Sequence, residues 1–280
     1  MKAIEIGKNR NNVKQIEFTS KEGNVTIYRL QYKGTAKTLE IINDIIKASY
    51  ERELTETEYT ILVKAIWLVF HHDTDNANSK LAGIKSISTC CLDNKYCIER
   101  MKDPTSICSH CYAATQQSRN YGLTDHNIIN GLILRNVIIP VDIFKALDLF
   151  FDKFVRIEGF GDVENITQAI NYIHIMKAFP QANFGVWTKN DSIWYKAFEI
   201  EGKPENCSFV VSSNHVNETI AIKPQFQSFV NHVFTVYDKE TVNNKDVEIN
   251  CGGRKCMECL KAGKNCYYKD TVFHIKELLK

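Results

Sequence analysis

Nine of the ten cysteines in this 280-residue chain lie in two short stretches, residues 90–111 and 251–266. The first stretch has the spacing C-C-x5-C-x10-C-x2-C, and the second has C-x4-C-x2-C-x6-C. Two thiolates separated by two residues can turn toward one point across a tight bend, so this spacing is typical of zinc and iron–sulfur sites. The tenth cysteine, Cys207, begins an apolar run and is predicted to be a small core residue.

The N-terminus and the hydropathy pattern favour metal binding over disulfides. Residues 1–8 (MKAIEIGK) lack the apolar core and the small-residue cleavage pattern of a signal peptide. The best apolar stretch, residues 61–70, is short and is interrupted by Lys64, so no membrane segment is expected. We therefore expect a cytoplasmic protein, and in a reducing compartment clustered cysteines are more often metal ligands than disulfides.

Each cysteine stretch has enough thiols for a metal site. Neighbouring side chains point apart in an extended chain, so we expect Cys91 to bind and keep Cys90 as the alternative. A single shared site, built from the C-x2-C pairs of both stretches, remains open. The irregular spacing favours one or two iron–sulfur clusters, most simply 4Fe–4S, with zinc as the alternative. The predicted ligands are Cys91, Cys97, Cys108 and Cys111 in the first stretch and Cys251, Cys256, Cys259 and Cys266 in the second.

The first 79 residues predict a hairpin followed by helices. Residues 13–18 and 25–32 carry strand-forming side chains, with a turn at residues 22–24. Helical patterns follow, and the second of them opens with the capping sequence TETE. Beyond the first cysteine stretch, Pro140 separates two further predicted helices. The four predicted helices span residues 38–50, 55–70, 125–139 and 141–152.

The second half of the chain alternates short apolar runs with helical patterns. Short, continuous apolar runs are typical of strands covered on both faces. This rhythm predicts an α/β fold, either a partial (β/α) barrel or an open parallel sheet. The expected strands are 154–157, 184–187, 208–211 and 232–236, and the helices between them are 165–179 and 192–198. We expect a hairpin-plus-helices extension (1–79), a cysteine-containing α/β core (80–250) and a cysteine-rich, metal-binding C-terminal segment (251–280).

Polar side chains follow the predicted parallel strands. Since the carboxyl ends of parallel strands meet at one edge of a sheet, ligands commonly bind there. Glu158 and Asp162 follow the first strand, with two glycines between them that let the backbone approach a ligand closely. Lys189 follows the second strand. These three residues are the predicted cofactor-binding side chains.

Several segments carry a family resemblance. Residues 80–94 (KLAGIKSISTCCLDN), 108–113 (CSHCYA), 155–162 (VRIEGFGD) and 187–189 (WTK), together with the cysteine-rich tail, resemble the phage and prophage family named after gene product 88. The resemblance covers about residues 80–268 and implies a phage protein in the cytoplasm of a bacterial host. The element CSHCYA is also similar to phage proteins related to radical S-adenosylmethionine enzymes, in which it belongs to an iron–sulfur site beside a partial barrel.

That second resemblance implies an iron–sulfur protein with a redox or radical-type role and possible binding of S-adenosylmethionine. The common radical enzymes use C-x3-C-x2-C, which leaves one iron open, whereas this chain has Cys97-x10-Cys108-x2-Cys111. If Cys91 or a C-terminal cysteine completes the ligand set, no iron is open. The cluster is then structural or transfers electrons, so the sequence leaves enzymatic activity undecided.

The charge balance bears on partners. A net charge of +2 and a pI of about 8.0 give no electrostatic footprint for nucleic acid. The alternative function is a zinc-stabilised module that binds nucleic acid or protein, supported by the basic stretch 254–269 with its two tyrosines. The leading hypothesis implies a redox partner or a small-molecule substrate. A nucleophilic enzyme using His110 or His215 has no motif behind it.

Overall fold

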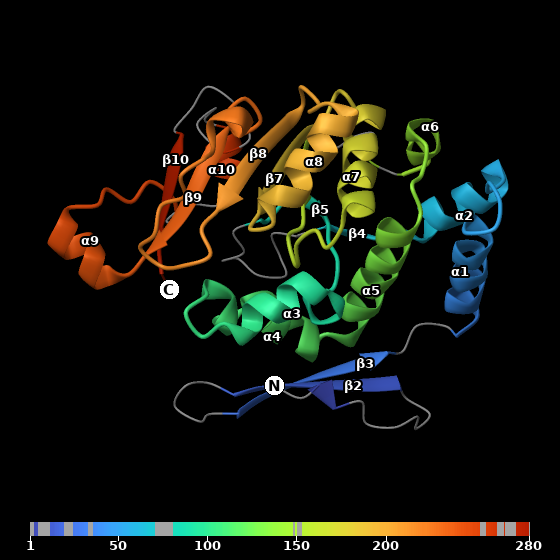
Figure 1. Ribbon diagram of the computed structural model, residues 1–280, viewed down its shortest axis with the longest axis horizontal. Coiled ribbons are helices and arrows are strands. Elements are labelled where there is room, and N and C mark those ends of the chain that lie inside the picture. Colours follow the sequence, from blue (N-terminus) through green and yellow to red (C-terminus); the bar gives the residue numbers. More distant parts are fainter. Residues whose placement is uncertain are drawn as a thin grey trace.

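The computed structural model describes residues 3–4, 12–19, 25–32, 36–70, 81–147, 149, 153–252, 256–261, 266 and 273–279. At its centre is an open seven-stranded sheet in the order β10-β9-β8-β7-β6-β5-β4 (Figure 1). Strands β5 to β10 run parallel, and β4 pairs antiparallel with β5. The strands are β4 (Leu68–Phe70), β5 (Lys85–Ile87), β6 (Phe154–Ile157), β7 (Asn183–Thr188), β8 (Cys207–Ser212), β9 (His232–Tyr237) and β10 (His274–Leu278). The prediction of an open parallel sheet is confirmed.

The order of the strands in the sheet follows their order in the chain, with no reversal. Right-handed crossovers that always advance in one direction place their helices on one face, as in a barrel that does not close. Helices α7 (Ile166–Ala178) and α8 (Asp191–Glu201) both lie on the front face in Figure 1. Val155 and Ile157 of β6 point toward them, into a core that includes the fully buried Trp194. Helices α7 and α8 therefore cover one face of the sheet and leave the opposite face to other segments.

The N-terminal hairpin is confirmed. β2 (Asn12–Thr19) pairs antiparallel with β3 (Val25–Tyr32), and the short β1 (Ala3–Ile4) pairs with β2. The predicted turn at residues 22–24 lies outside the described residues. Helix α1 (Ala36–Ser49) follows, close to the predicted range.

Two predicted helices are longer than the observed ones. Helix α2 (Glu56–Ala65) ends early, because the all-apolar run after it is extended and forms the edge strand β4. Helix α6 (Val141–Phe144) is a single turn after Pro140, so the predicted helix 141–152 does not continue over residues 145–147 and 149, and its other positions lie outside the described residues. Helix α5 (Tyr121–Asn136) begins earlier than predicted because Asn120 caps it, accepting the Leu123 N–H at 3.1 Å. The local apolar patterns predicted that these elements exist more accurately than they predicted where the elements begin and end.

Several elements were not predicted. Strand β5 lies just before the first cysteine stretch, and β10 comes after the second. Because β4 and β10 join the sheet of the central core, the three predicted segments share one sheet. The other elements without a prediction are the helices α3 (Lys95–Lys102), α4 (Tyr112–Arg119), α9 (Lys239–Lys245) and α10 (Cys256–Lys261) and the 3₁₀ turns Cys91–Asp93, Ile107–His110 and Pro224–Phe226.

Helix α2 begins with the capping box that the sequence predicts. The Thr55 hydroxyl accepts the Glu58 backbone N–H at 3.3 Å, and the Glu58 carboxylate accepts the Thr55 N–H at 2.8 Å. Replacing Thr55 by alanine is expected to lower the free energy of unfolding by about 1 kcal/mol. Urea denaturation measures this loss, with Thr57→Ala in the exposed first turn as the control. Equal midpoints for the two variants would show that the cap contributes nothing.

Within the residues that the structure describes, no helix combines the length and the apolar character needed to cross a bilayer.

Candidate metal centre

The first cysteine stretch lies over the carboxyl edge of the parallel sheet. In Figure 1, α3 and α4 lie below the sheet, on the side to which the arrowheads of β8 and β9 point. Three hydrogen bonds fasten this stretch to the loops after β6 and β8. The Ile107 N–H donates to the Asn214 carbonyl at 2.8 Å, the Asn94 amide to the Asp162 carbonyl at 2.6 Å, and the Tyr112 hydroxyl to the Gly159 carbonyl at 2.9 Å.

The thiols of this stretch gather near one another. The Cys91 and Cys111 side chains lie next to each other, and each changes the pKa of the other. Cys97 is within electrostatic range of Cys91, Cys108 and Cys111. Apolar side chains pack around them, among them Leu92, Met101, Ala114 and Phe160. We call Cys91, Cys97, Cys108 and Cys111 the first cysteine group.

Cys111 is set up to ionise. The neighbouring Cys91 side chain lowers the pKa of Cys111 to about 6 against the opposing effect of burial, with help from the backbone N–H groups of Ala114 and Ala113. Those N–H groups open α4, and a helix N-terminus stabilises a thiolate. The pKa of Cys91 is raised in return. A lowered pKa favours the thiolate, which is the form of cysteine that binds metals.

Lys189 supplies positive charge beside these thiols. Burial lowers the pKa of Lys189, but Cys108, Asp162 and Cys111 together raise it above its usual value. The ammonium group therefore stays charged near the sulfur atoms. A cation in this position offsets the negative charge that a set of thiolates would bring.

The neighbouring cysteines Cys90 and Cys91 have different surroundings. The Gln117 side-chain oxygen accepts the Cys91 backbone N–H at 3.0 Å and the Cys91 thiol at 2.9 Å. Cys90 is fully buried, and burial raises its pKa to about 12. The contact with Cys111 is made by Cys91, which favours it over Cys90 as a ligand.

The second cysteine stretch lies against the sheet near its β10 edge. Cys251 forms a bridge with Glu277 of β10, and its N–H donates to the Lys276 carbonyl at 3.0 Å. Cys256 and Cys259 are one turn apart on α10. The Cys266 carbonyl accepts the Ser208 hydroxyl of β8 at 2.5 Å.

Cys266 is close to two other thiols of this stretch. Burial raises the pKa of Cys266, and Cys256 and Cys251 raise it further. The thiols that most affect one another therefore belong to the same stretch, which favours two separate sites over one shared site. Residues 253–255, 262–265 and 267–270, which contain most of the basic side chains and both tyrosines of the predicted nucleic-acid surface, lie outside the described residues.

No set of three or more His, Cys, Asp or Glu side chains in the described ranges has the arrangement of a formed metal site. The thiols of the first cysteine group are neighbours whose sulfur atoms must still converge to share an ion or cluster. Metal binding usually couples to such ordering, because the metal supplies the free energy that brings charged ligands together.

Glu158 is a buried hub and has an unusual backbone conformation. It is 4% exposed and has a φ of 54°, in the left-handed region. Its carboxylate accepts hydrogen bonds from the Thr89 N–H at 3.0 Å, the Thr89 hydroxyl at 2.9 Å, the Gln168 amide at 2.7 Å and the Tyr172 hydroxyl at 2.6 Å. Glu158 thus fastens the residues before Cys90 to β6 and α7, and cofactor binding by this residue stays a prediction.

Burial raises the pKa of Glu158 to about 7, against its hydrogen bonds from Tyr172 and Thr89. Because this pKa lies above the usual value, its stabilising contribution is complete below about pH 4.5 and is lost as the pH rises through about 7. We expect infrared difference spectra between pH 6 and pH 8 to show a buried protonated carboxyl that ionises. Glu158→Gln should lack this band, and an identical spectrum in the variant would contradict the assignment.

Asp162 joins the ends of β6 and β7. It is 6% exposed, and its carboxylate accepts the Thr188 hydroxyl at 2.6 Å, the Lys189 N–H at 2.7 Å and the Val163 N–H at 2.8 Å. It also lies within electrostatic range of Cys97 and Cys108. Asp162 and Lys189 are thus beside the first cysteine group at the predicted edge, and their role in cofactor binding stays a prediction.

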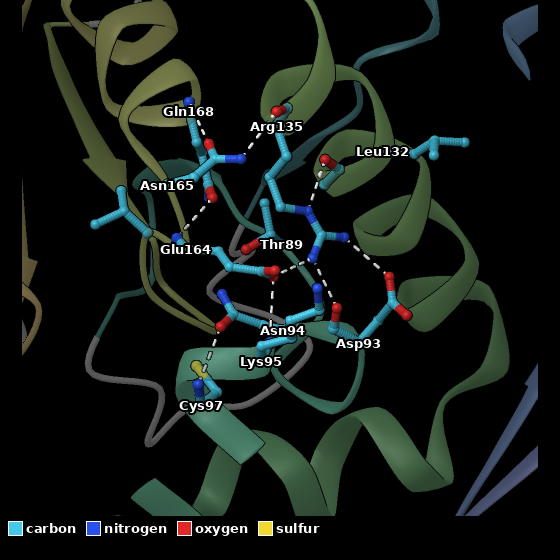
Figure 2. A network of polar contacts seen from close by, with 12 residues as sticks. Thr89, Asp93, Asn94, Lys95, Cys97, Leu132, Arg135, Glu164, Asn165 and Gln168 are labelled. Atoms are coloured by element: carbon cyan, nitrogen blue, oxygen red, sulfur yellow. Dashed lines mark hydrogen bonds and ion pairs between the residues drawn. The ribbon is translucent and has the colours of Figure 1, made fainter. Parts of the chain in front are cut away.

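The residue that sequence reasoning missed is Arg135 on α5. Its guanidinium donates to the Asp93 carboxylate at 2.9 Å, the Asp93 carbonyl at 2.7 Å and the Glu164 carboxylate at 2.5 Å (Figure 2). Asp93 follows Cys91 by two residues, and Glu164 precedes α7. Arg135 therefore ties the cysteine loop to two helices, and no local pattern in the sequence signals this pairing.

Comparison with known proteins places the chain in a family. Residues 47–274 match the family model for gene product 88. The chain belongs to the gene product 88 family. The match confirms the predicted phage gene-product family and begins earlier than the predicted 80–268, so that it takes in α2 and β4. No curated protein and no solved structure matches the chain. The similarity to radical S-adenosylmethionine enzymes has no support in these comparisons.

Proposed function

We propose that this gene product 88 protein binds an iron–sulfur cluster through the first cysteine group and has a redox role in the cytoplasm of the bacterial host. The gathering of Cys91, Cys97, Cys108 and Cys111 over the carboxyl edge of the sheet carries this proposal. The second cysteine stretch, with Cys251, Cys256, Cys259 and Cys266, is proposed as a second site. The role implies a redox partner or a small-molecule substrate.

The donor chemistry fits an iron–sulfur cluster. All four donors of the first group are thiols, which are the ligands that iron–sulfur clusters use. They lie among Leu92, Met101 and Phe160, and an apolar, largely dry surrounding is one means of setting a cluster's reduction potential. Zinc also accepts four thiolates, so it is the alternative that the experiment must exclude.

A bound cluster would supply one-electron redox chemistry, and the surrounding residues have roles of their own. Lys189 offsets thiolate charge, Gln117 fixes Cys91, and Phe160 helps to exclude water. Four cysteine ligands leave no iron open, which favours electron transfer or a structural role over the finer hypothesis of a radical enzyme. S-adenosylmethionine binding would require one of the four thiols to stay free.

Anaerobic purification followed by iron, zinc and acid-labile sulfide analysis tests the proposal. We expect a coloured protein with about four iron atoms and four sulfides per cluster. A colourless protein that contains only zinc would replace this function by the alternative of a zinc-stabilised binding module. Calorimetry with S-adenosylmethionine on the same preparation separates the two redox versions, since only the radical-enzyme version requires binding.

A further inference from the structure

We propose that Arg156, held against Trp187, binds an anionic group of a small molecule, a carboxylate or a phosphate, on the sheet face opposite α7 and α8. The inference goes beyond the proposed function and does not depend on which metal the cysteines hold. It rests on the position of Arg156, on the small residues beside it and on the absence of an acidic partner for it among the residues that the structure describes.

Arg156 lies in the middle of the sheet. Its neighbours on β6, Val155 and Ile157, point into the core beneath the two helices, so Arg156 points to the opposite face together with Phe154. Phe154 packs there with Cys256 and Cys266 of the second cysteine stretch. Arg156 therefore projects from a central strand toward the sheet face against which the second cysteine stretch packs.

Small residues flank Arg156 in the sheet. Its partner on β5 is Ser86 and its partner on β7 is Gly185, beyond which lies Ser208 of β8. In this row across four strands, Arg156 is the one residue with a long side chain. Neither Ser86 nor Gly185 places a bulky side chain directly beside the guanidinium, while the Ser208 end of the row is covered by the Cys266 carbonyl.

The guanidinium is held in a fixed plane. Its central carbon lies 3.4 Å from the centre of the Trp187 ring, and the pair is a close cation–π contact. This stacking fixes one face of the guanidinium and leaves its edge free to donate. A flat arginine edge presents paired N–H groups that match carboxylate and phosphate oxygens.

Within the described part of the chain, Arg156 has no carboxylate partner, and its buried Nε atom has no hydrogen-bond acceptor. Partly buried arginines are normally paired, because removing a charge from water is costly. The two carboxylates that follow β6 are engaged elsewhere, Glu158 with Tyr172 and Thr89, and Asp162 with Thr188. The arrangement thus leaves a cation that an external anion would complete.

Tyr112, the residue after Cys111, lies near Arg156. The Tyr112 hydroxyl is within electrostatic range of both Arg156 and Lys189, and the Tyr112 side chain is 64% exposed. Arg156 also lies near Cys266, so it is between the two cysteine stretches. An anion held by Arg156 would therefore lie close to Cys266 and Tyr112, between the two cysteine stretches.

The competing role for Arg156 is to offset thiolate charge in the second cysteine stretch. Lysine would serve that role equally well, whereas recognition through the guanidinium edge requires arginine. Arg156→Lys and Arg156→Gln together separate the two roles. Arg119→Gln, on the exposed end of α4, is the matched control.

The experiment titrates anaerobically purified full-length protein with inorganic phosphate and, separately, with succinate, followed by calorimetry. We expect at least one of them to bind in the millimolar range or tighter, with affinity reduced about tenfold or more in Arg156→Gln and substantially in Arg156→Lys. Arg119→Gln should bind like the unmodified protein, and all variants should keep the metal content of the unmodified protein.

Three outcomes would overturn the inference. The first is that neither anion binds the unmodified protein, and the second is that both bind Arg156→Gln with unchanged affinity. The third is that Arg156→Gln loses metal and Arg156→Lys restores both metal and binding, which would assign Arg156 to the thiolates. The first two outcomes leave the metal content unchanged, so they would not bear on the proposed function.

Discussion

Serine in place of Cys97 or Cys111 is expected to remove most of the iron held by the first cysteine group. Each residue is one of four thiols that gather at the carboxyl edge, and the Cys111 thiol is the one with a lowered pKa. A hydroxyl is a poor substitute for a thiolate as a ligand to iron. Iron and sulfide per chain should fall by about one cluster in each variant, while a second site in the C-terminal stretch would keep its own content.

Cys207→Ala is the matched control for the cysteine variants. Cys207 is fully buried on β8, and its side chain belongs to the main core and not to the clusters around the two cysteine stretches. Its replacement should reduce stability by removing a buried sulfur and should leave the iron content unchanged. If all three variants keep the full iron content, the first cysteine group does not bind the iron.

Leucine in place of Arg135 should reduce the free energy of unfolding by about 3 kcal/mol. The Arg135 side chain is 10% exposed and pairs with Glu164, which is 17% exposed, and with Asp93, which is 36% exposed. Removing the cation leaves the Glu164 carboxylate buried without its partner, which costs more than losing an exposed ion pair. Urea denaturation measures the loss, and iron retention should fall too because Asp93 no longer anchors the cysteine loop.

Arg119→Leu, at the exposed end of α4, provides the comparison for Arg135→Leu. A surface change of this kind should stay within about 0.5 kcal/mol. Similar denaturation midpoints for Arg119→Leu and Arg135→Leu would show that the network in Figure 2 contributes little to stability.

The sequence predicted the centre of the sheet and missed its edges. Strands β6 to β9 are predominantly apolar runs between helical patterns, and all four were predicted close to their observed ranges. Strand β4 was assigned to a helix, because an apolar run of this length has no period that separates a strand from the end of a helix. Strands β5 and β10 contain lysines and partly exposed positions, so local hydrophobicity gives no signal for them.

The same contrast holds for the candidate site. Spacing alone predicted that Cys97, Cys108 and Cys111 act together, because their separation along the chain is short enough for local folding to bring them close. The supporting contacts join residues far apart in the chain, such as Arg135 with Asp93 and Glu158 with Thr89. A single sequence contains no signal for such pairings, since each is decided by how strands and helices pack.

Anomalous X-ray diffraction from crystals grown without oxygen, collected on both sides of the iron absorption edge, tests the central claim most directly. The account predicts a strong iron peak enclosed by the sulfur atoms of Cys91, Cys97, Cys108 and Cys111 at the carboxyl edge of the sheet. Free thiols or disulfides at these four positions, or a peak that appears only at the zinc edge, would contradict it.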